Sequence, residues 1–413
     1  MVWRRIDLQT DKRADLLALS SIPLIMTLGN SMFIPVLPEI RRQLHVSAFQ
    51  TSLLITSYSV MAILLIPIAG YLSDRLGRKA VIIPSLLIAA MGGAVCGAAA
   101  VWMDNSYPII LAGRVLQGIG AAGAMPIVLP LVGDMFNNEQ DVSSGLGMIE
   151  TANTSGKVLS PMLGSALVAI VWYLPFWAIP VLCFISITLV FFLVKKPEKP
   201  EKRPVPIRPF LRSTLQLLKE HFRWLMALFM IGGIGMFMLF GLLFYLSETL
   251  EETHGYKGIW KGCILAIPLA VLSAASFVAG KCIGNNKRRM KWIVCSGFGL
   301  SAAAVGGCLL FDSVAGVIAC LSAAGLGIGA SLPCLDSFIT DGIEKEQRGT
   351  ISSLYSSMRF VGVAAGPMIA ALLMKESDKI LFTTMIAAGA VAALLALLAI
   401  RAGKYENKLV NVK

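Results

Sequence analysis

The chain has 413 residues, of which 56% are hydrophobic and only 15% are charged. Soluble domains carry about 25% charged residues, so this composition excludes an ordinary water-soluble globule. The formal net charge of +12 would suit a nucleic-acid-binding protein, but the basic residues flank long apolar runs, where they indicate membrane topology instead. We therefore expect a lipid bilayer as the surroundings and no nucleic-acid partner.

Long apolar runs recur along almost the whole chain. About 20 apolar residues suffice to cross the hydrocarbon core as a helix. The sequence thus predicts an all-α membrane protein with twelve transmembrane helices in two pseudo-symmetric six-helix bundles. In chain order the expected spans are 15–38, 50–72, 80–102, 108–131, 143–168, 172–194, 223–247, 259–281, 291–311, 314–336, 350–374 and 380–401.

A polar stretch rich in Lys and Pro divides these spans six and six. Residues 1–194 are expected to form the N-terminal bundle, and residues 195–222 a cytoplasmic linker with a short surface helix over 210–222. Residues 223–413 are expected to form the C-terminal bundle and a cytoplasmic tail.

The basic residues are distributed unequally between the two sides of the predicted membrane. If the N-terminus is cytoplasmic, 27 Lys and Arg residues fall inside and 6 outside. This asymmetry matches the positive-inside rule, so both termini are expected in the cytoplasm. The expected location is the cell membrane.

The two halves resemble each other in sequence. A pattern of Gly, Pro, Asp and Gln over 118–140 recurs 207 positions later, and Gly156 and Pro161 recur as Gly362 and Pro367. Internal repeats with a central site at their interface characterise secondary transporters. Such a protein moves a small molecule by alternating access.

The loop after the second expected span reads GYLSDRLGRK. Gly70 and Gly77 allow a tight turn between two helices, Asp74 ends a helix, and Arg75 and Arg78 belong to a basic cluster. This loop resembles the signature loop of the major facilitator superfamily. The resemblance implies that these five residues take part in conformational gating.

Three further motifs resemble the twelve-helix drug–proton antiporters of that superfamily. They are LGNSMFIPVLP in the first span, LAGRVLQGIGAA in the fourth and GKVLSPMLGS in the fifth. In the fifth-span motif, Ser160 and Ser165 replace two glycines, which weakens the case for antiport specifically. The resemblance implies proton-coupled efflux of drugs or amphipathic metabolites by a monomer, with the proton as coupling ion and no other cofactor.

Small residues in the fifth and eleventh spans are expected to allow close helix contacts. Gly156, Ser160 and Gly164 recur every four residues, and Pro161 and Pro367 introduce kinks. In the family, these paired helices are where the halves rock against each other. We therefore include these residues in the predicted gating set.

Five ionisable residues lie within expected spans: Arg114, Glu150, Lys157, Asp336 and Arg359. Each costs about 2.5–3.5 kcal/mol at the centre of a helix in lipid, so each should face the cavity or a partner. By resemblance, Arg114 takes part in proton coupling; the alternative is that it braces helices. Asp336 is a second candidate for the proton.

Glu150, Asn153 and Lys157 share one face of the fifth span. In one interpretation Glu150 binds and releases the coupling proton, which a partly dry cavity favours. In a second, Glu150 and Lys157 form a permanent ion pair, and in a third Glu150 lies in the cytoplasmic mouth.

Asn30, Asn153 and Tyr245 are the expected polar residues of the substrate cavity. Many drug-exporting relatives have an acid in the first span, where this chain offers Asn30. Two cations near the midplane, Lys157 and Arg359, favour an anionic or zwitterionic small-molecule substrate.

Other classes of protein lack support in the sequence. Neither Gly-Lys pair is followed by the Ser or Thr of a nucleotide-binding loop. The three histidines fall in loops and the eight cysteines show no paired spacing, so neither a metal site nor an enzyme is expected. A lipid or glycolipid flippase, a polar-solute transporter and a receptor on the same fold remain alternatives.

Overall fold

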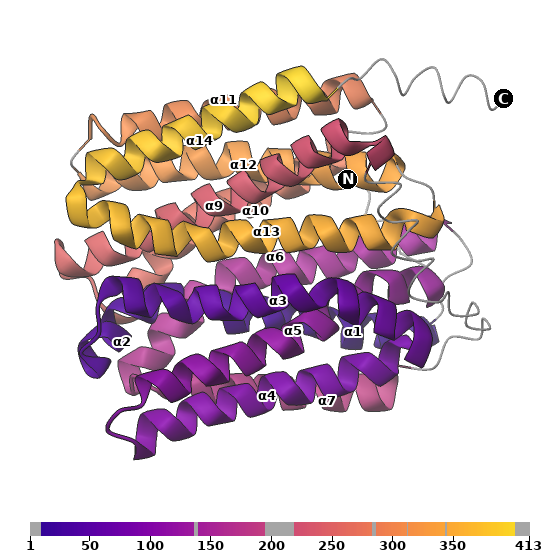
Figure 1. The fold of residues 1–413 in the computed structure, drawn as a ribbon, viewed down its shortest axis with the longest axis horizontal. Helices are drawn as coiled ribbons and strands as arrows, with labels where there is room; N and C mark the ends of the chain where they lie inside the picture. The colour runs from indigo at the N-terminus through magenta and orange to yellow at the C-terminus, as the bar shows by residue number, and fades with distance from the viewer. Residues whose placement is uncertain are drawn as a thin grey trace.

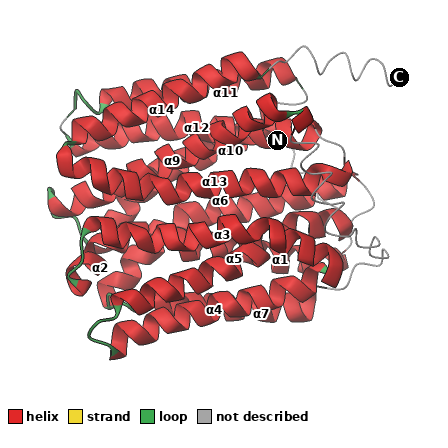
Figure 2. Cartoon of the chain, viewed as in Figure 1, coloured by secondary structure: helices red, strands yellow, loops and turns green. Residues whose placement is uncertain are grey.

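The computed structural model describes residues 10–135, 139–194, 219–282, 286–311, 313–342 and 345–400. Within these ranges every regular element is a helix, and the long helices run roughly side by side (Figures 1 and 2). The predicted surface helix over 210–222 falls outside the described residues except for its last four.

The first six predicted spans correspond to eight elements of the structure. These are α1 (Thr10–Ser31), η1 (Ile34–Val36), α2 (Leu37–Leu44), α3 (Ala48–Leu76), α4 (Arg78–Trp102), α5 (Tyr107–Met135), α6 (Glu139–Ile170) and α7 (Leu174–Leu193). The second six spans are α9 (Phe222–Glu252), α10 (Gly258–Cys282), α11 (Lys287–Gly307), α12 (Val314–Gly342), α13 (Lys345–Glu376) and α14 (Asp378–Ala399).

Ten segments in the described part of the chain are long and apolar enough to cross a membrane. The first of them comprises α1, η1 and α2 together. The two other long helices, α6 and α11, are more polar and fall outside this set, although each takes its place in a bundle of six. The expected architecture of twelve helices in two bundles is confirmed.

The first span is not one continuous helix. Pro38 has no N–H to donate to the carbonyl of Ile34, four residues earlier, so regular α-helical bonding is interrupted there. A 3₁₀ turn over Ile34–Val36 fills the break, and α2 continues as far as Leu44. The span therefore extends beyond the predicted end at residue 38.

Helix packing repeats between the two halves. The contacts α3–α5, α4–α7 and α1–α6 in the first half correspond to α10–α12, α11–α14 and α9–α13 in the second. The halves meet mainly where α3 packs on α13 and α6 packs on α10, and α3 and α13 lie side by side in Figure 1. The repeat seen in the sequence is thus a structural repeat.

The helices approach closely at the glycines, as expected, but most of these contacts lie within one half. A Cβ on Gly164 of α6 would lie 2.2 Å from the Met32 carbonyl oxygen at the end of α1. One on Gly362 of α13 would lie 2.0 Å from the carbonyl oxygen of Gly233 in α9. Across the halves it is Pro161 of α6 that contacts α10, where its carbonyl faces Gly262. The small residues of α6 and α13 therefore pack the helices of each half against one another. Pro161 adds a contact between the two halves.

The packing of α6 on α1 can be tested with one methyl group. Gly164→Ala should lower the melting temperature by several degrees in detergent, because overpacking against a backbone typically costs about 1–3 kcal/mol. The control is Gly299→Ala on α11, where an added Cβ meets nothing within 4 Å. It should leave the melting temperature unchanged or slightly higher, since Ala favours helix. Equal melting temperatures for both variants would contradict this packing.

Candidate transport site

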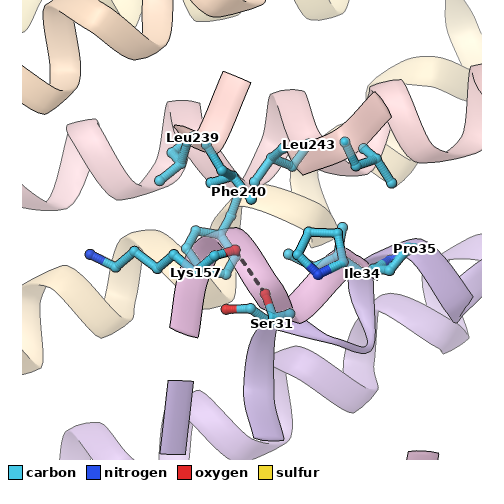
Figure 3. A pocket seen from close by; sticks show the side chains of 11 residues that line it. Ser31, Ile34, Pro35, Lys157, Leu239, Phe240 and Leu243 are labelled. Atoms are coloured by element: carbon cyan, nitrogen blue, oxygen red, sulfur yellow. Dashed lines mark hydrogen bonds between the residues drawn. The ribbon is translucent and has the colours of Figure 1, made fainter. Parts of the chain in front are cut away.

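A narrow pocket lies between the two halves. Its walls come from η1 and α6 on one side and from α9 and α10 on the other, and they include Ile34, Pro35, Lys157, Phe240 and Leu243. Apart from Lys157 and two serines the lining is apolar. Figure 3 shows that the ammonium end of Lys157 points away from Ile34 and Pro35. The pocket therefore has an apolar end at η1 and a charged end beyond Lys157.

Charged groups of both halves gather around Lys157. The charges of Glu150 on α6, Asp336 on α12 and Arg359 on α13 all act on its ammonium group. Asp336 and Arg359 form an ion pair 3.7 Å apart, with side chains 46% and 22% exposed. The structure thus brings four of the five predicted intramembrane charges to one region between the halves.

Glu150 is held by polar neighbours on its own helix. Asn153 Nδ2 donates to both of its carboxylate oxygens at 3.3 Å, and Thr154 Oγ1 donates at 3.5 Å. Among the described residues no ion pair joins Glu150 to Lys157, and the Glu150 side chain is exposed. The permanent pair that the sequence allowed is therefore not formed in this conformation.

The fifth charge, Arg114, is fully buried in α5 away from this group. Its guanidinium donates to the carbonyl of Leu54 on α3 at 2.8 Å and to Asn30 Oδ1 on α1 at 2.9 Å. The rings of Phe33 and Tyr58 lie 4.5 and 4.8 Å from it on either side. Arg114 therefore braces α1, α3 and α5, and no carboxylate in the described part of the chain pairs with it.

Both asparagines that were expected in the cavity lie inside the N-terminal half instead. Asn30 accepts from Arg114, and Asn153 Oδ1 accepts from Thr27 Oγ1 at 2.6 Å. Both are more than nine-tenths buried and neither lines the pocket. The amide oxygen of each accepts a hydrogen bond from a neighbouring helix, so the assignment to the cavity is corrected for both.

Tyr245 also lies away from the pocket. Its ring packs on Phe382 of α14 at 4.9 Å between centroids, and its hydroxyl is 3.5 Å from Asp378 Oδ2. The residues of α9 that do line the pocket are Leu239, Phe240 and Leu243. The Met- and Phe-rich helix thus contributes to the cavity through an apolar face.

The signature loop has the backbone geometry that its glycines predict. Gly77 adopts a φ of 96°, which favours glycine, and separates α3 from α4. Asp74 forms an ion pair with Arg78, and Arg78 also donates to Ser73 Oγ at 2.7 Å. A Cβ on Gly70 would lie 3.7 Å from Ser353 Oγ on α13, so the loop adjoins the other half.

Sequence reasoning missed a charged cluster at the end of the bundle opposite the chain termini. We call it the distal charge cluster. It consists of Glu39, Arg41 and Arg42 on α2, Glu248, Glu251 and Glu252 on α9, and Lys261 on α10. The dense charges at 39–42 and 248–252 are a signal in the sequence, but basic residues at the ends of spans are also typical of loops.

The distal charge cluster joins the two halves. Arg41 donates to Glu248 at 2.8 Å and also pairs with Glu252. Lys261 Nζ donates to Glu251 at 2.6 Å and to the Pro35 carbonyl at 2.7 Å. Next to it, Ser247 Oγ donates to the Ile34 carbonyl at 3.0 Å. These contacts close the distal end of the interface between the halves.

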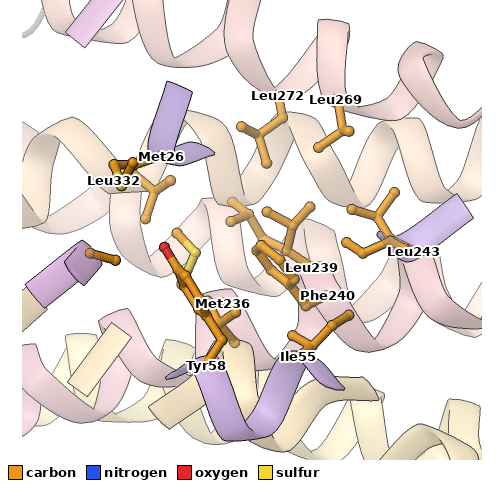
Figure 4. Packing of buried hydrophobic residues seen from close by; sticks show 14 of the residues in the cluster. Met26, Ile55, Tyr58, Met236, Leu239, Phe240, Leu243, Leu269, Leu272 and Leu332 are labelled. Atoms are coloured by element: carbon orange, nitrogen blue, oxygen red, sulfur yellow. The ribbon is translucent and has the colours of Figure 1, made fainter. Parts of the chain in front are cut away.

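Between this cluster and the end with the termini, apolar side chains fill the interface between the halves. Figure 4 shows Met26, Ile55 and Tyr58 of the first half in one buried group with Met236 and Phe240 of α9. Toward the other end the charged residues around Lys157 are partly exposed. The structure is closed at the distal end and more open toward the termini.

Two halves that enclose a pocket, with one end closed by interhalf contacts, define an alternating-access transporter. Comparisons with known proteins place the chain within this class. The family model described as Major Facilitator Superfamily matches residues 19–367 and 291–410. The chain therefore belongs to the major facilitator superfamily, a family of transporters.

Relatives narrow the kind of transporter. The chain is 53% identical to the bacillibactin exporter of Bacillus subtilis (strain 168) over 395 residues, which cover 95% of this chain and 98% of that protein. It is 26% identical over 396 residues to the class C tetracycline resistance protein of Escherichia coli, covering 92% and 94%. This chain is a secondary transporter of the type that exports drugs or metabolites.

A solved structure supports the fold. A bacterial homologue of the human lysosomal transporter Spinster, in an inward-facing and unoccupied conformation, matches with a TM-score of 0.77 at 18% identity. The match covers 96% of this chain and 98% of that one.

The bracing role of Arg114 gives a specific expectation. Arg114→Lys keeps the charge but cannot reach acceptors on α1 and α3 at once, because Lys lacks the planar guanidinium group with its several donors. Hydrogen bonds to charged groups are worth about 1.5–3 kcal/mol, so the variant should melt at a clearly lower temperature. Arg288→Lys, at an exposed position of α11, is the matched control and should melt like the wild type. A stable Arg114→Lys protein that loses only proton coupling would instead favour the coupling role.

Proposed function

We propose that this chain exports an anionic or zwitterionic metabolite from the cytoplasm in exchange for protons, with bacillibactin as the first candidate substrate. The 53% identity with the bacillibactin exporter over nearly the full length supports that candidate. In this proposal both termini lie in the cytoplasm, as the charge asymmetry indicates, and the distal end faces outside.

The surroundings of Lys157 support an anionic group on the substrate. In the part of the chain that the structure describes, Lys157 Nζ has no hydrogen bond or ion pair, although it lies at the pocket between the halves. A cation in such surroundings is costly unless a counter-charge approaches it. Arg359 adds a second cation from the opposite half. Its ion pair with Asp336 is long, with 3.7 Å between the nitrogen and the oxygen. An anionic group of the substrate would supply the missing partner of Lys157.

Glu150 is the proposed carrier of the coupling proton. Its charge acts on Lys157, so binding or release of a proton at Glu150 changes the net charge of the group around that ammonium. The Glu150 side chain is exposed, and it lies on the side of the pocket that is nearer to the chain termini. Asp336, which faces the same group of charges, is the second candidate.

Removing the free cation should separate anionic from cationic substrates. In proteoliposomes with an imposed pH gradient, Lys157→Ala should lower bacillibactin uptake into inside-out vesicles about tenfold or more, since a lost charge-assisted contact is worth about 1.5–3 kcal/mol. Lys375→Ala, at the exposed end of α13, is the control and should transport normally. Strong transport of cationic dyes that Lys157→Ala leaves unchanged would overturn the proposed substrate class, and lipid or polar-solute flux in the same panel would favour those alternatives.

The proton carrier can be tested in the same vesicles. Glu150→Gln should abolish flux driven by the pH gradient but retain binding of bacillibactin, because the amide fills the same space and cannot exchange a proton. Glu376→Gln, at the end of α13, is the matched control and should keep gradient-driven flux. If Glu150→Gln transports like the wild type, Glu150 is not the carrier and the same substitution at Asp336 becomes the decisive one.

A further inference from the structure

The distal charge cluster contains one carboxylate more than it has cations. Its ion pairs join four carboxylates to three cations. The exposed side chain of Lys257, in the loop after α9, also acts on Glu39 at the rim. Away from that rim, the carboxylates of Glu248 and Glu251 are buried with Lys261 as the one buried cation.

Glu248 is the group that this excess leaves incompletely paired. Its side chain is 3% exposed, and its Oε2 accepts from Arg41 at 2.8 Å. Its Oε1 is buried and has no hydrogen-bond partner among the described residues. A buried carboxylate oxygen without a donor is unfavourable, and a proton on that oxygen removes the charge while Oε2 can still accept from Arg41.

Glu248 has charged neighbours on its own helix and on the helices packed around it. From α2 it is faced by Arg41 and Arg42, and from α10 by Lys261, all of which act on it electrostatically. Its own helix adds Glu251 and Glu252, and Glu39 lies beyond Arg42. On α14, Asp378 lies at Tyr245, one helical turn before Glu248.

We propose that the distal charge cluster is a gate and that Glu248 is its proton-binding site. Glu248 takes its proton from outside and keeps it when the gate closes. In the open gate this carboxylate faces external water and can take a proton from it. Closure then buries the excess carboxylate in neutral form, so external acid favours the closed gate. The inference rests on the proposed proton-coupled export, in which return of the empty carrier takes up an external proton.

The position of Glu248 connects this gate to the pocket. Ser247, the preceding residue, donates to the Ile34 carbonyl, and Lys261 donates to the Pro35 carbonyl. Ile34 and Pro35 also line the apolar end of the pocket (Figure 3). Opening the distal charge cluster therefore moves backbone that forms the pocket wall.

The gate can be measured without substrate. Spin labels on Asn105→Cys and Thr253→Cys, in a background without the native cysteines, report the separation of the two halves at the distal end by double electron–electron resonance in nanodiscs. As the pH falls from about 8 to about 5, the closed-to-open ratio should rise, by at most about tenfold per pH unit for one proton. Glu248→Gln, which resembles the protonated acid, should stay closed and lose this pH response.

The matched control is Glu252→Gln. Glu252 pairs with the same arginine but is 48% exposed, so this variant should respond to pH like the wild type. A wild-type gate that opens on acidification, or does not respond, would overturn the proposal, as would an unchanged response in Glu248→Gln. Because the distances are read without transport, this result is independent of whether gradient-driven flux of bacillibactin is found in proteoliposomes.

Discussion

The break in the first span is the constraint on which the rest of the interface depends. Pro38 cannot donate to the carbonyl of Ile34, and a buried carbonyl in a membrane protein must find another partner. The partner comes from the other half, where Ser247 supplies a hydroxyl, and Lys261 reaches the neighbouring carbonyl of Pro35. The missing N–H in one half is thus compensated by the Ser247 hydroxyl of the other half, and Lys261 adds a second contact at the next carbonyl. The same turn forms the apolar end of the pocket, so the local chemistry of proline sets both the gate and the wall of the transport site.

The cations inside the spans, in the described part of the chain, are stabilised in two different ways. Arg114 has acceptors on α1 and α3 and an aromatic ring on either side, so its charge is satisfied by the protein itself. Lys157 lies in a mostly apolar pocket without such partners among the described residues. A cation that is fully satisfied stabilises one arrangement of helices, whereas an unsatisfied cation has affinity left for a ligand. This difference separates the structural charge from the candidate substrate contact, although both residues are basic and both lie inside spans.

Much of the fold could be predicted because its signals are local or periodic. Apolar length predicted the helices, and the spacing of Gly156 and Pro161 against their repeats predicted a structural symmetry that the helix contacts confirm. The gathering of charges around Lys157 agrees with the expectation that a charge inside a span faces the cavity or a partner. Tyr245 was misplaced because sequence periodicity cannot tell which face of an apolar helix meets the cavity. The pairing of Arg41 with Glu248 was missed because it joins residues 207 positions apart across two helices, and no short-range pattern reports such a contact.

A gate made of ion pairs also suits the energetics of alternating access. Closing an apolar surface is favourable by about 25 cal/mol per Å² of area removed from water, and reopening it costs the same. Buried ion pairs behave differently, because the attraction between the charges is largely offset by the water they give up. When the distal end opens, the arginines of α2 and the carboxylates of α9 regain hydration as they lose each other. Their net contribution to the free energy of the closed state is therefore small. Their geometry still fixes the position of one half relative to the other. When the two states are nearly balanced in this way, a single proton on Glu248 is enough to shift the equilibrium toward the closed gate, which apolar packing alone would not allow.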